Sequence, residues 1–460
     1  MIDTVDVAVV GGGIAGLSAA YELERRGLTV RLLEASDRIG GVIRTERRDG
    51  WVIDAGPDAL LAQKPAAVQL CRELGLADRL VSTQLPRTAY VLRDGQLRPL
   101  VEGSFLGFPI SIGALARSSL FSWRAKLRMA CEVAVPPAPA GDQSIASFTR
   151  RRFGQEALDY LGEPLLAGIH AGDAERLSLE TLFPRLAEAE RRSGSVLRSL
   201  RHTKIAASPT GAFVSLPGGT GELVDALSGA LTPGTVRLSS AVTSVHRAGV
   251  FTVDARGASV RAGAVIVCVP AYAAAGMLRA IDTSLAVICD TVPYASTATV
   301  AFGYRREQVR HPLDGSGFVV PRIESNPLLA ATWVSSKWPG RAPDGHVLLR
   351  GFLGGGRDPD RLDQSDRDLV QIAQDALAGT LGIEGDPILT LLSRYPRQSP
   401  QYEVGHLTRV ASIEDRLSAV PGLFLAGSGF RAIGIPDCIA DGRETAARAA
   451  AFVGAKGPDR

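Results

Sequence analysis

The sequence has almost no net charge and no pattern among its cysteines. Its 460 residues hold 51 Lys and Arg against 48 Asp and Glu, a formal net charge of +3. Nucleic-acid-binding proteins carry a clear basic excess, so this balance predicts no nucleic-acid partner. Metal sites place cysteines at short fixed spacings that are missing here, so we expect reduced thiols and no metal. The five cysteines are Cys71, Cys131, Cys268, Cys289 and Cys438.

Long apolar runs and a leader segment are missing too. No 18 consecutive apolar residues occur, so the sequence predicts no membrane-spanning helix. Residues 1–10 pass directly into a strand pattern without a basic leader, so we expect no signal peptide. These absences favour a cytoplasmic protein, with peripheral contact at the inner face of the membrane as its closest approach to lipid. With 45% hydrophobic and 22% charged residues, the chain is long enough for two or three globular domains.

A glycine-rich segment near the N-terminus carries the strongest signal. Residues 5–36 run VDVAVVGGGIAGLSAAYELERRGLTVRLLEAS: a strand, a glycine-rich turn, a helix and a second strand that ends at Glu34. Gly11 permits the tight turn, Gly13 lets the backbone approach a pyrophosphate, and Gly16 lets the helix pack against the strand. The helix N-terminus stabilises phosphate charge, and the Glu34 carboxylate can accept hydrogen bonds from ribose hydroxyls. A plain glycine-rich turn is the alternative, but the complete order of strand, helix, strand and acid favours a dinucleotide site.

The residues after Glu34 extend this motif. ASDRIGGVIRT (35–45) adds a second glycine pair, Gly40 and Gly41, and two arginines, and WVIDAGPDAL (51–60) follows it. The combination resembles the motif of the FAD-dependent oxidase superfamily, which includes amine oxidases, phytoene desaturases and protoporphyrinogen oxidases. The FAD contacts that this resemblance implies are Gly11, Gly12, Gly13, Ile14, Ala15, Gly16, Glu34, Ala35, Arg38, Gly41, Val42, Gly56, Pro57, Asp58, Ala59 and Val242.

The order of patterns along the chain predicts a discontinuous α/β architecture. We expect a Rossmann-like FAD-binding domain, a helical domain and a mixed-sheet substrate domain. Their predicted bounds are 1–80, 206–284 and 400–455 for the first, 81–205 for the second and 285–399 for the third. Alternating runs at 235–270 indicate a β-meander whose last strand, AGAVIVCVP, should rejoin the parallel sheet. The third region should hold several strands and one acidic helix at 366–381.

Three further segments resemble one family within this superfamily. They are similar to segments of protoporphyrinogen and coproporphyrinogen oxidases. The segments are EPLLAGIHAGDAERLSLETLFPRL (163–186), SPQYEVGHLTRV (399–410) and GLFLAGSGFRAIGIPDCIADGRETA (422–446). That family removes six electrons from a porphyrinogen in haem biosynthesis, with noncovalent FAD as acceptor and oxygen as reoxidant. Membership implies a porphyrinogen and oxygen as partners, and transient contact with the next haem-pathway enzyme.

The C-terminal segment is expected to complete the cofactor site. The resemblance implies FAD contacts at Ser428, Ile433, Gly434 and Ile435, with a helix that starts at about Pro436. Asp437 suits the first turn of that helix, and we expect its carboxylate to turn away from the flavin or to hydrogen-bond locally. Two positions depart from the family: His170 stands where a tyrosine is common, and Leu407 stands where many relatives carry a tryptophan.

Two substrates are known within the family, coproporphyrinogen III and protoporphyrinogen IX. The protoporphyrinogen branch commonly has an arginine just before the aromatic residue of a stretch like AYVLRDGQLRP (89–99). Ala89 occupies that place here, and Arg87 lies two residues earlier. GSFLGFP and EPLLAGI look more like the coproporphyrinogen oxidases of Gram-positive bacteria. The four propionates of coproporphyrinogen suit an open, basic pocket, so coproporphyrinogen III is favoured.

Oxidation of a porphyrinogen by a flavin depends mainly on positioning and requires no strong protein base, so we assign no catalytic side chain. Arg87 and His170 are candidates for contact with substrate, although a packed, hydrogen-bonded histidine is the favoured interpretation of His170. Other residues could form apolar walls for a macrocycle or could be core strand positions. They are Phe318, Val319, Val320, Trp333 and Trp338.

Two segments have open interpretations. Residues 101–135 interleave apolar residues with basic ones, which fits either a helix on a membrane surface or a pair of core helices with solvated arginines. Residues 189–212 are basic and fit either a solvated loop or a rim that attracts carboxylates.

Two other functions also remain open. An amine oxidase would usually place paired aromatic residues, and sometimes a flavin-linked cysteine, before the terminal Gly-x-Pro. Phe430, Arg431, Ala432 and Ile433 stand there instead, and Cys438 comes later. The other alternative is an FAD-binding protein without turnover that serves as a carrier or partner for a haem-pathway enzyme, and intact motifs at both ends argue against it.

Overall fold

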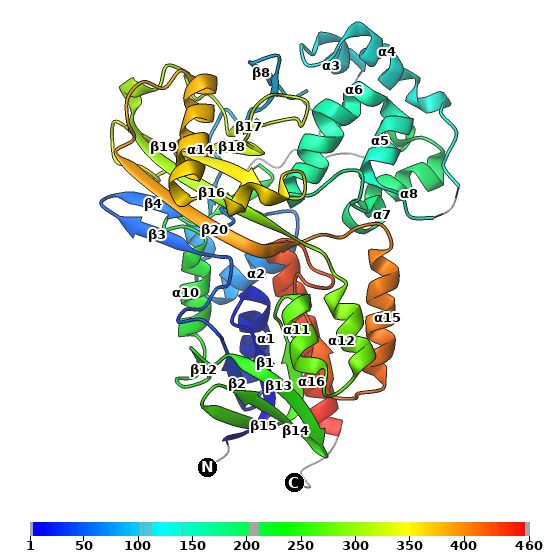
Figure 1. The fold of residues 1–460 in the computed structure, drawn as a ribbon, viewed down its shortest axis with the longest axis vertical. Coiled ribbons are helices and arrows are strands. Elements are labelled where there is room, and N and C mark those ends of the chain that lie inside the picture. The colour runs from blue at the N-terminus through cyan, green and yellow to red at the C-terminus, as the bar shows by residue number, and fades with distance from the viewer. Residues whose placement is uncertain are drawn as a thin grey trace.

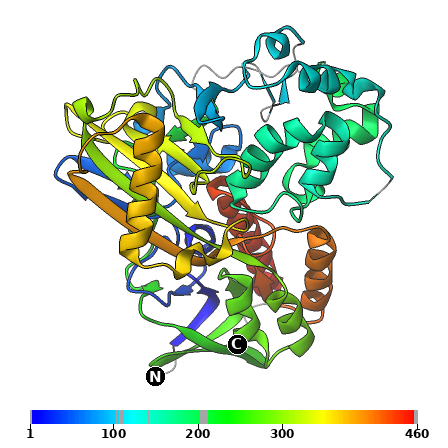
Figure 2. The ribbon, with the colours of Figure 1, turned by 45° about the horizontal axis from the view of Figure 1, so that its top comes forward.

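The computed structural model describes residues 3–101, 104–105, 108–109, 112–139, 141–201 and 211–455. Figure 1 shows a lower unit, called the Rossmann unit here, with the N- and C-terminal ends near its base. Two lobes lie above it, a sheet lobe on one side and a helical lobe on the other. Figure 2, from a tilted view, shows the same separation of the two lobes.

The Rossmann unit is built on a seven-stranded sheet of order β12-β2-β1-β15-β14-β13, with β21 also paired to β15. Strands β12, β2, β1, β15 and β21 are mutually parallel, and β13 and β14 continue the sheet as antiparallel neighbours. The pairing of Val7 with Ala264 shows that the last strand of the predicted meander rejoins the parallel sheet, as expected. The strands are β1 (Asp3–Val10), β2 (Val30–Leu33), β12 (Val236–Arg237), β13 (Val242–Ala248), β14 (Val250–Ala255), β15 (Ala258–Val267) and β21 (Leu423–Leu425).

Helices cover both faces of this sheet, which explains why its central strands are continuous apolar runs. On one face, a Cβ on Gly442 would overlap the carbonyl oxygen of Ala15, so α16 lies directly against the start of α1. The helices of that face are α1 (Ile14–Arg25), α2 (Pro65–Glu73), α10 (Gly221–Gly229) and α16 (Ile435–Ala455). Those of the other face are α11 (Ala271–Leu278), α12 (Thr283–Asp290) and α15 (His406–Ser418).

The sheet lobe holds a second seven-stranded sheet, of order β20-β16-β19-β18-β17-β7-β8, with α14 (Asp366–Leu381) packed on it. The acidic helix therefore lies at the predicted residues. The strands are β7 (Ala89–Arg93), β8 (Gln96–Pro99), β16 (Tyr294–Arg305), β17 (Gly317–Val319), β18 (Ala330–Trp333), β19 (His346–Gly354) and β20 (Leu389–Pro400). The short helices of this region are α13 (Val334–Lys337), η5 (Arg306–Gln308) and η6 (Pro359–Asp363).

Strands β7 and β8 fall within 81–205, the predicted mainly helical domain, but belong to the second sheet. They form a hairpin across Asp94 and Gly95, and β7 runs parallel to β17 through pairs such as Phe318 with Tyr90. A local pattern can indicate a hairpin, but it cannot show that the partner strand lies more than 200 residues away.

Three small sheets lie outside the two large ones. They are β3 (Thr45–Arg48) with β4 (Trp51–Asp54); β11 (Phe213–Ser215) between β5 (Leu60–Leu61) and β6 (Val81–Ser82); and β9 (Ser104–Phe105) with β10 (Phe108–Pro109). A short 3-10 helix, η1 (Ala77–Arg79), precedes β6.

The helical lobe packs short helices around its own apolar core. They are α3 (Ile112–Arg117), α4 (Trp123–Ala130), η2 (Cys131–Ala134), α5 (Ile145–Phe153), α6 (Gln155–Ala157), the π-helical η3 (Leu158–Ala167), η4 (Gly168–His170), α7 (Leu179–Leu182), α8 (Pro184–Ser193) and α9 (Val196–Arg201). Of the basic segment predicted at 189–212, residues 202–210 lie outside the described residues.

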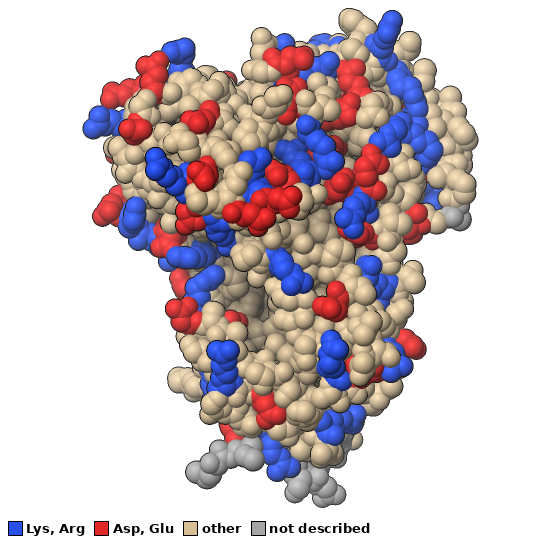
Figure 3. All heavy atoms as spheres, viewed as in Figure 1, with Lys and Arg blue, Asp and Glu red and all other residues tan. Residues whose placement is uncertain are grey.

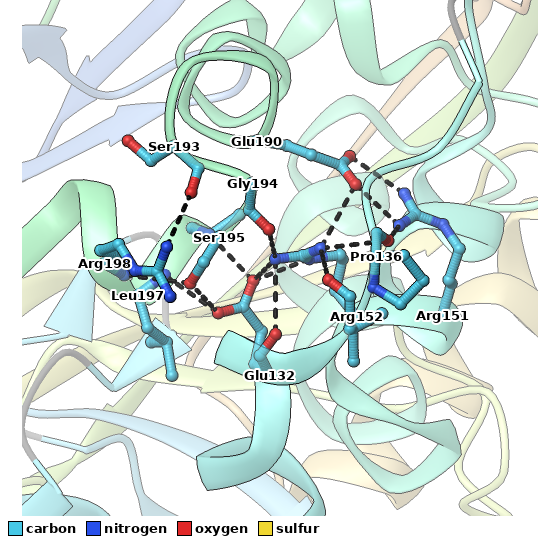
Figure 4. Close-up of polar contacts among 12 residues, drawn as sticks. Glu132, Pro136, Arg151, Arg152, Glu190, Ser193, Gly194, Ser195, Leu197 and Arg198 are labelled. Atoms are coloured by element: carbon cyan, nitrogen blue, oxygen red, sulfur yellow. Dashed lines mark hydrogen bonds and ion pairs between the residues drawn. The ribbon is translucent and has the colours of Figure 1, made fainter.

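Buried charge holds several of these helices together (Figure 4). The side chains of Arg152 and Glu132 are fully buried and form an ion pair. Glu190 accepts hydrogen bonds from Arg151 at 2.7 and 3.0 Å. The described helices include none long and apolar enough to cross a membrane.

Candidate functional site

The glycine-rich turn after β1 leaves its backbone accessible. Gly11 has φ +102°, and a Cβ there would lie 2.8 Å from the carbonyl oxygen of Cys268. A Cβ on Gly16 would overlap the carbonyl oxygen of Gly11, which brings α1 against the turn, as the motif requires. At Gly13, by contrast, nothing lies within 4 Å of the Cβ position. The turn is therefore closed toward the sheet and open at the position where a phosphate would approach.

Glu34 and the second glycine pair lie beside this turn. The Glu34 carboxylate accepts a hydrogen bond from the Gly12 N–H at 2.6 Å. Gly12 in turn accepts one from the Gly40 N–H at 2.8 Å, and a Cβ on Gly41 would lie 3.3 Å from the Gly13 Cα. The guanidinium of Arg38 donates to the carbonyl oxygens of Ile39, Gly41 and Ile43 at 3.1, 2.5 and 3.2 Å. Arg38 thus braces its own loop.

The segment just before β13 lies beside the carboxyl end of β2, next to Glu34. The Ser240 N–H donates to the Glu34 carbonyl oxygen at 2.8 Å, and the Ser239 N–H donates to that of Ser36 at 2.8 Å. Val242, two residues on, is buried. Ala35 lies between the two acceptor residues, so these predicted contacts converge at the carboxyl end of β2.

Side chains donate to the carbonyl oxygens of residues 54–58, from the end of β4 into the loop before β5. Thr299 Oγ1 donates to the Ala55 oxygen, Thr220 Oγ1 to that of Pro57 and Ser215 Oγ to that of Asp58, at 2.8, 2.8 and 2.9 Å. The Arg350 Nη1 group donates to the carbonyl oxygens of both Asp54 and Gly56. This loop contains the predicted contacts Gly56, Pro57, Asp58 and Ala59, and its donors come from three distant segments.

The Asp58 side chain is held on the sheet-lobe side of the loop. Its Oδ2 accepts from Lys337 Nζ at 3.0 Å and from Trp338 Nε1 at 3.1 Å, and Arg350 Nη2 lies 3.4 Å from Oδ1. Burial alone would raise the pKa of this carboxyl, but Lys337 and Arg350 hold the pKa well below its usual range. Asp58 therefore stays charged and fixes the loop to the sheet lobe.

The C-terminal segment meets the N-terminal turn. A Cβ on Gly427 would lie 3.3 Å from the Ala15 Cβ. The carbonyl oxygen of the predicted contact Ser428 accepts a hydrogen bond from the Tyr402 hydroxyl at 2.9 Å. Gly434, another predicted contact, has φ +87°. Helix α16 starts at Ile435, one residue before the predicted position.

Asp437 in the first turn of α16 pairs with Lys64 of the segment before α2. Lys64 Nζ lies 2.6 Å from Asp437 Oδ2, and about half of the lysine side chain is exposed. His170 lies near this pair: burial, and next the Lys64 charge, lower the pKa of its imidazole to about 4. Its ring packs edge-on against Phe183, with 5.9 Å between centroids. His170 is therefore neutral at neutral pH.

The other predicted substrate contacts divide between a position near β6 and the core of the sheet lobe. Arg87 is half-buried beside β6, and its Nε donates to the Thr83 carbonyl oxygen at 3.1 Å. Phe318 and Val320 are 2% and 0% exposed in the core beneath α14, with Trp333. Trp338 is also fully buried and binds Asp58. These four apolar residues occupy core positions, the alternative that the sequence left open, whereas Val319 is half-buried against the core of the helical lobe.

Sequence reasoning missed Lys64, Arg350 and Tyr395. Lys64 stands in no motif, and its partner is 373 residues away. Arg350 could have been noticed, because it interrupts the apolar pattern of HVLLRGFLGG. Tyr395 lies near Gly56, since a Cβ on that glycine would be 3.4 Å from the Tyr395 hydroxyl.

These residues fit a flavin dinucleotide. The open position at Gly13 and the N-terminus of α1 suit a pyrophosphate. The Tyr395 hydroxyl and Arg350 Nε are buried without a partner among the described residues, so a bound group with acceptor atoms would satisfy them. On the face of Figure 3 the molecular surface is hollowed between the Rossmann unit and the sheet lobe.

The comparisons with known proteins show a flavin-containing family. The family model for flavin containing amine oxidoreductase matches residues 14–450. The coproporphyrinogen III oxidase of Bacillus subtilis (strain 168) is 35% identical, over 97% of this chain and 98% of its own. The chloroplastic protoporphyrinogen oxidase of Nicotiana tabacum is 28% identical, over 98% of this chain and 86% of its own.

Solved structures show the same fold. A crystal structure from Exiguobacterium sp. 255-15, assigned to protoporphyrinogen oxidase, has a TM-score of 0.86 and 30% identity, covering 98% of this chain and 99% of that one. A putrescine oxidase structure has a TM-score of 0.72 and 19% identity, covering 98% and 100%, which supports the fold alone. This protein is a member of the flavin-containing amine oxidoreductase family, an oxidoreductase whose predicted fold and superfamily are confirmed.

Proposed function

We propose that this protein oxidises a porphyrinogen to the corresponding porphyrin in haem biosynthesis, with noncovalent FAD as acceptor and oxygen as reoxidant. Coproporphyrinogen III is the favoured substrate over protoporphyrinogen IX. The similarity to coproporphyrinogen III oxidases across nearly the whole chain carries the proposal. The cytoplasm is the proposed location, and the next haem-pathway enzyme is the proposed transient partner.

Both ends of the chain would hold the FAD. Gly11 to Gly16 would bind the pyrophosphate, Glu34 the ribose, and the loops at 38–42 and 55–59 the rest of the cofactor. Val242, Ser428 and the 433–435 segment would complete the site. Bound FAD supplies the acceptor for hydride. The chain contributes binding and orientation, and the braced loops described above suit that task because they cost no reorganisation when the cofactor binds.

Noncovalent binding fits the state of the cysteine beside the C-terminal segment. Cys438 is buried, and its Sγ lies 3.6 Å from the Ala432 carbonyl oxygen. Burial, followed by the charges of Asp441 and Asp437, raises the pKa of its thiol to about 12. A thiol that stays protonated is a poor nucleophile toward a flavin ring.

Lys64 is the proposed cation for a substrate propionate. Lys64 precedes α2 and reaches Asp437 in the first turn of α16, near His170. Its half-exposed side chain can exchange Asp437 for an incoming carboxylate. His170 is neutral there, so it would contribute hydrogen bonding or packing rather than charge. Arg87 remains a second candidate.

Contact with an anionic membrane surface is proposed for α4. Trp123 and Leu127 are 74% and 68% exposed and stand four residues apart, so they lie on one face of that helix. Arg117 and Arg124 are exposed and form no ion pair with the described residues. Basic side chains gather over this edge of the helical lobe in Figure 3. Aromatic and aliphatic side chains beside arginines are typical of helices that lie on anionic lipid.

The decisive experiment supplies each porphyrinogen to the purified protein under oxygen and follows porphyrin fluorescence and hydrogen peroxide. We expect porphyrin formation with coproporphyrinogen III at a higher rate than with protoporphyrinogen IX. Peroxide release with amines alone would instead establish an amine oxidase. Tight FAD binding without oxidation of any substrate would leave the carrier alternative.

A further inference from the structure

Arg350 connects the sheet lobe to the backbone of the predicted flavin-facing loop. Its side chain is 3% exposed, and its guanidinium packs over the Phe352 ring at 4.7 Å. One nitrogen, Nη1, donates to the carbonyl oxygens of both Asp54 and Gly56, the latter at 2.7 Å. The second, Nη2, faces the Asp58 carboxylate at 3.4 Å. A single buried cation therefore supplies two of the five carbonyl contacts between residues 54 and 58.

These contacts orient the peptide groups of the loop. All five carbonyl oxygens point to donors of the surrounding protein, whereas the N–H groups of Gly56 and Ala59 have no acceptor among the described residues. Gly56 and Ala59 are only half-buried. The positive ends of these peptide dipoles are thus left for a bound group, and a group that becomes more negative would be stabilised by them.

Three arginines act on the position next to Gly56, beside the negative Asp58 carboxylate. Burial raises the pKa of the Tyr395 hydroxyl, and the charges of Arg350, Arg38 and Arg44 act against that increase. All three arginines therefore act at the position of Tyr395, next to Gly56. Arg44 is paired with Glu46, and Arg38 is bound to its own loop, so Arg350 is the buried cation among them.

We propose that Arg350 is a positioning residue that orients the amide groups of residues 56–59 toward the flavin and makes the flavin easier to reduce. This inference rests on the flavin part of the proposed function and not on its substrate. Reduction by two electrons and one proton leaves a negative charge on the flavin, and oriented amides with a nearby buried cation stabilise that charge. Removal of Arg350 should therefore lower the reduction potential.

The test measures the flavin potential without any porphyrinogen. The holoprotein is reduced anaerobically by xanthine and xanthine oxidase in the presence of a reference dye, and Arg350→Met, Arg350→Lys and Thr299→Val are compared with the unchanged protein. In Arg350→Met, loss of one charge-assisted contact should lower the two-electron equilibrium constant about tenfold, equivalent to about 30 mV. Arg350→Lys keeps the positive charge but loses the two-pronged guanidinium group. Its flavin potential should therefore lie between those of Arg350→Met and the unchanged protein. Thr299→Val, which releases only the Ala55 oxygen, should shift it less than Arg350→Met.

Arg341→Lys is the matched control. Arg341 is also a buried arginine of this region, but it binds the Asp54 carboxylate at 3.1 Å and the oxygens of Ser215 and Leu216, not the loop carbonyls. This variant should lose thermal stability and keep its potential.

Hydrogen exchange of the flavin-free protein provides a second measurement, in case Arg350→Met does not fold. Hydrogen-bonded amides of this loop, such as that of Ala55, which donates to the Arg44 carbonyl oxygen at 2.9 Å, should exchange faster in Arg350→Lys than in the unchanged protein. A folded Arg350→Lys with unchanged exchange in this loop, or an Arg350→Met that binds flavin at the unchanged potential, overturns the proposal. Neither result depends on which substrate the enzyme oxidises, so failure here and failure of the proposed function are distinguishable.

Discussion

Single ionisable side chains in this protein are buried in defined protonation states. Asp58 stays charged because Lys337 and Arg350 surround its carboxylate. His406 stays neutral: its Nε2–H donates to the Phe430 carbonyl oxygen at 2.8 Å, and its ring stacks on Tyr402 at 3.9 Å between centroids. Together with the bond from Tyr402 to Ser428, this histidine fixes the backbone before α16.

The neutral state of His406 predicts a loss of stability in acid. Burial, the largest cause, lowers the pKa of its imidazole from 6.5 to about 4. Below pH 6.5 the unfolded chain takes up a proton that the folded chain does not, so stability should fall as the pH drops from 6.5 to 4. The difference corresponds to about 3 kcal/mol over that window.

Urea unfolding at several pH values checks this prediction. His406→Gln keeps a donor for Phe430 but cannot titrate, so its stability should depend less on pH between 6.5 and 4. An equally steep dependence in the variant would contradict the assignment.

Lys64 gives a prediction about the substrate. If it binds a propionate, Lys64→Met should raise KM for coproporphyrinogen III about tenfold, because a charge-assisted hydrogen bond is lost. Lys64→Arg should largely restore it, and Asp437→Asn, which removes the competing carboxylate, should not raise KM. Steady-state porphyrin fluorescence gives these values, and an unchanged KM in Lys64→Met would exclude the contact.

At the scale of elements, the buried carboxylate of Glu132 links short helices of the helical lobe. Glu132 of η2 accepts from the Val196 and Leu197 N–H groups at 2.9 and 3.3 Å, which caps the start of α9. The same carboxylate pairs with Arg152 of α5, which also donates to the Gly194 carbonyl oxygen at 2.8 Å. One buried residue therefore joins three elements of the helical lobe.

Substitution of Glu132 should lower the free energy of unfolding. Glu132→Ala leaves Arg152 buried without its partner and should destabilise the protein by about 3–5 kcal/mol. Glu188→Ala is the control, because Glu188 is exposed and its pair with Arg191 should contribute less than about 1 kcal/mol. Urea unfolding followed by tryptophan fluorescence compares the two, and equal losses would contradict a special role for the buried pair.

Helix α4 gives the prediction about membranes. The double variant Trp123→Ala and Leu127→Ala should bind phosphatidylglycerol vesicles at least about tenfold more weakly, since both side chains would insert at the interface. Val287→Ala, an exposed apolar residue of α12, should bind as the unchanged protein does. Vesicle co-sedimentation measures this, and binding that is unaffected by the double variant would place the contact elsewhere.

At the scale of the whole molecule, the cofactor site depends on contact between the two ends of the chain. α16 lies against α1 at Gly442 and Ala15, and Gly427 lies against Ala15 as well. Because FAD would bind only when both ends are in place, its binding should stabilise the whole protein. At free FAD about 100 times Kd, the gain is about 2.7 kcal/mol.

Two glycines of α16 test this coupling. Gly442→Ala puts a Cβ into the Ala15 carbonyl oxygen and should weaken FAD binding and lower Tm. Gly454→Ala lies in the same helix with nothing within 4 Å of its Cβ, so it should raise stability by up to about 1 kcal/mol. Thermal unfolding with and without added FAD distinguishes the two, and an FAD-dependent Tm shift as large in Gly442→Ala as in the unchanged protein would refute the coupling.

The sequence by itself determined the Rossmann unit and the superfamily. The glycine spacing, the following helix, Glu34 and the start of α16 are local features, because turn geometry and helix starts depend on a few neighbouring residues. Only the tertiary structure decided that β7 and β8 join the second sheet, that Lys64 pairs with Asp437, that Arg350 binds the loop at 54–58 and that Phe318 and Val320 lie in the core. Each of these contacts joins residues that are far apart in the chain, and no local preference specifies which distant group fills such a position.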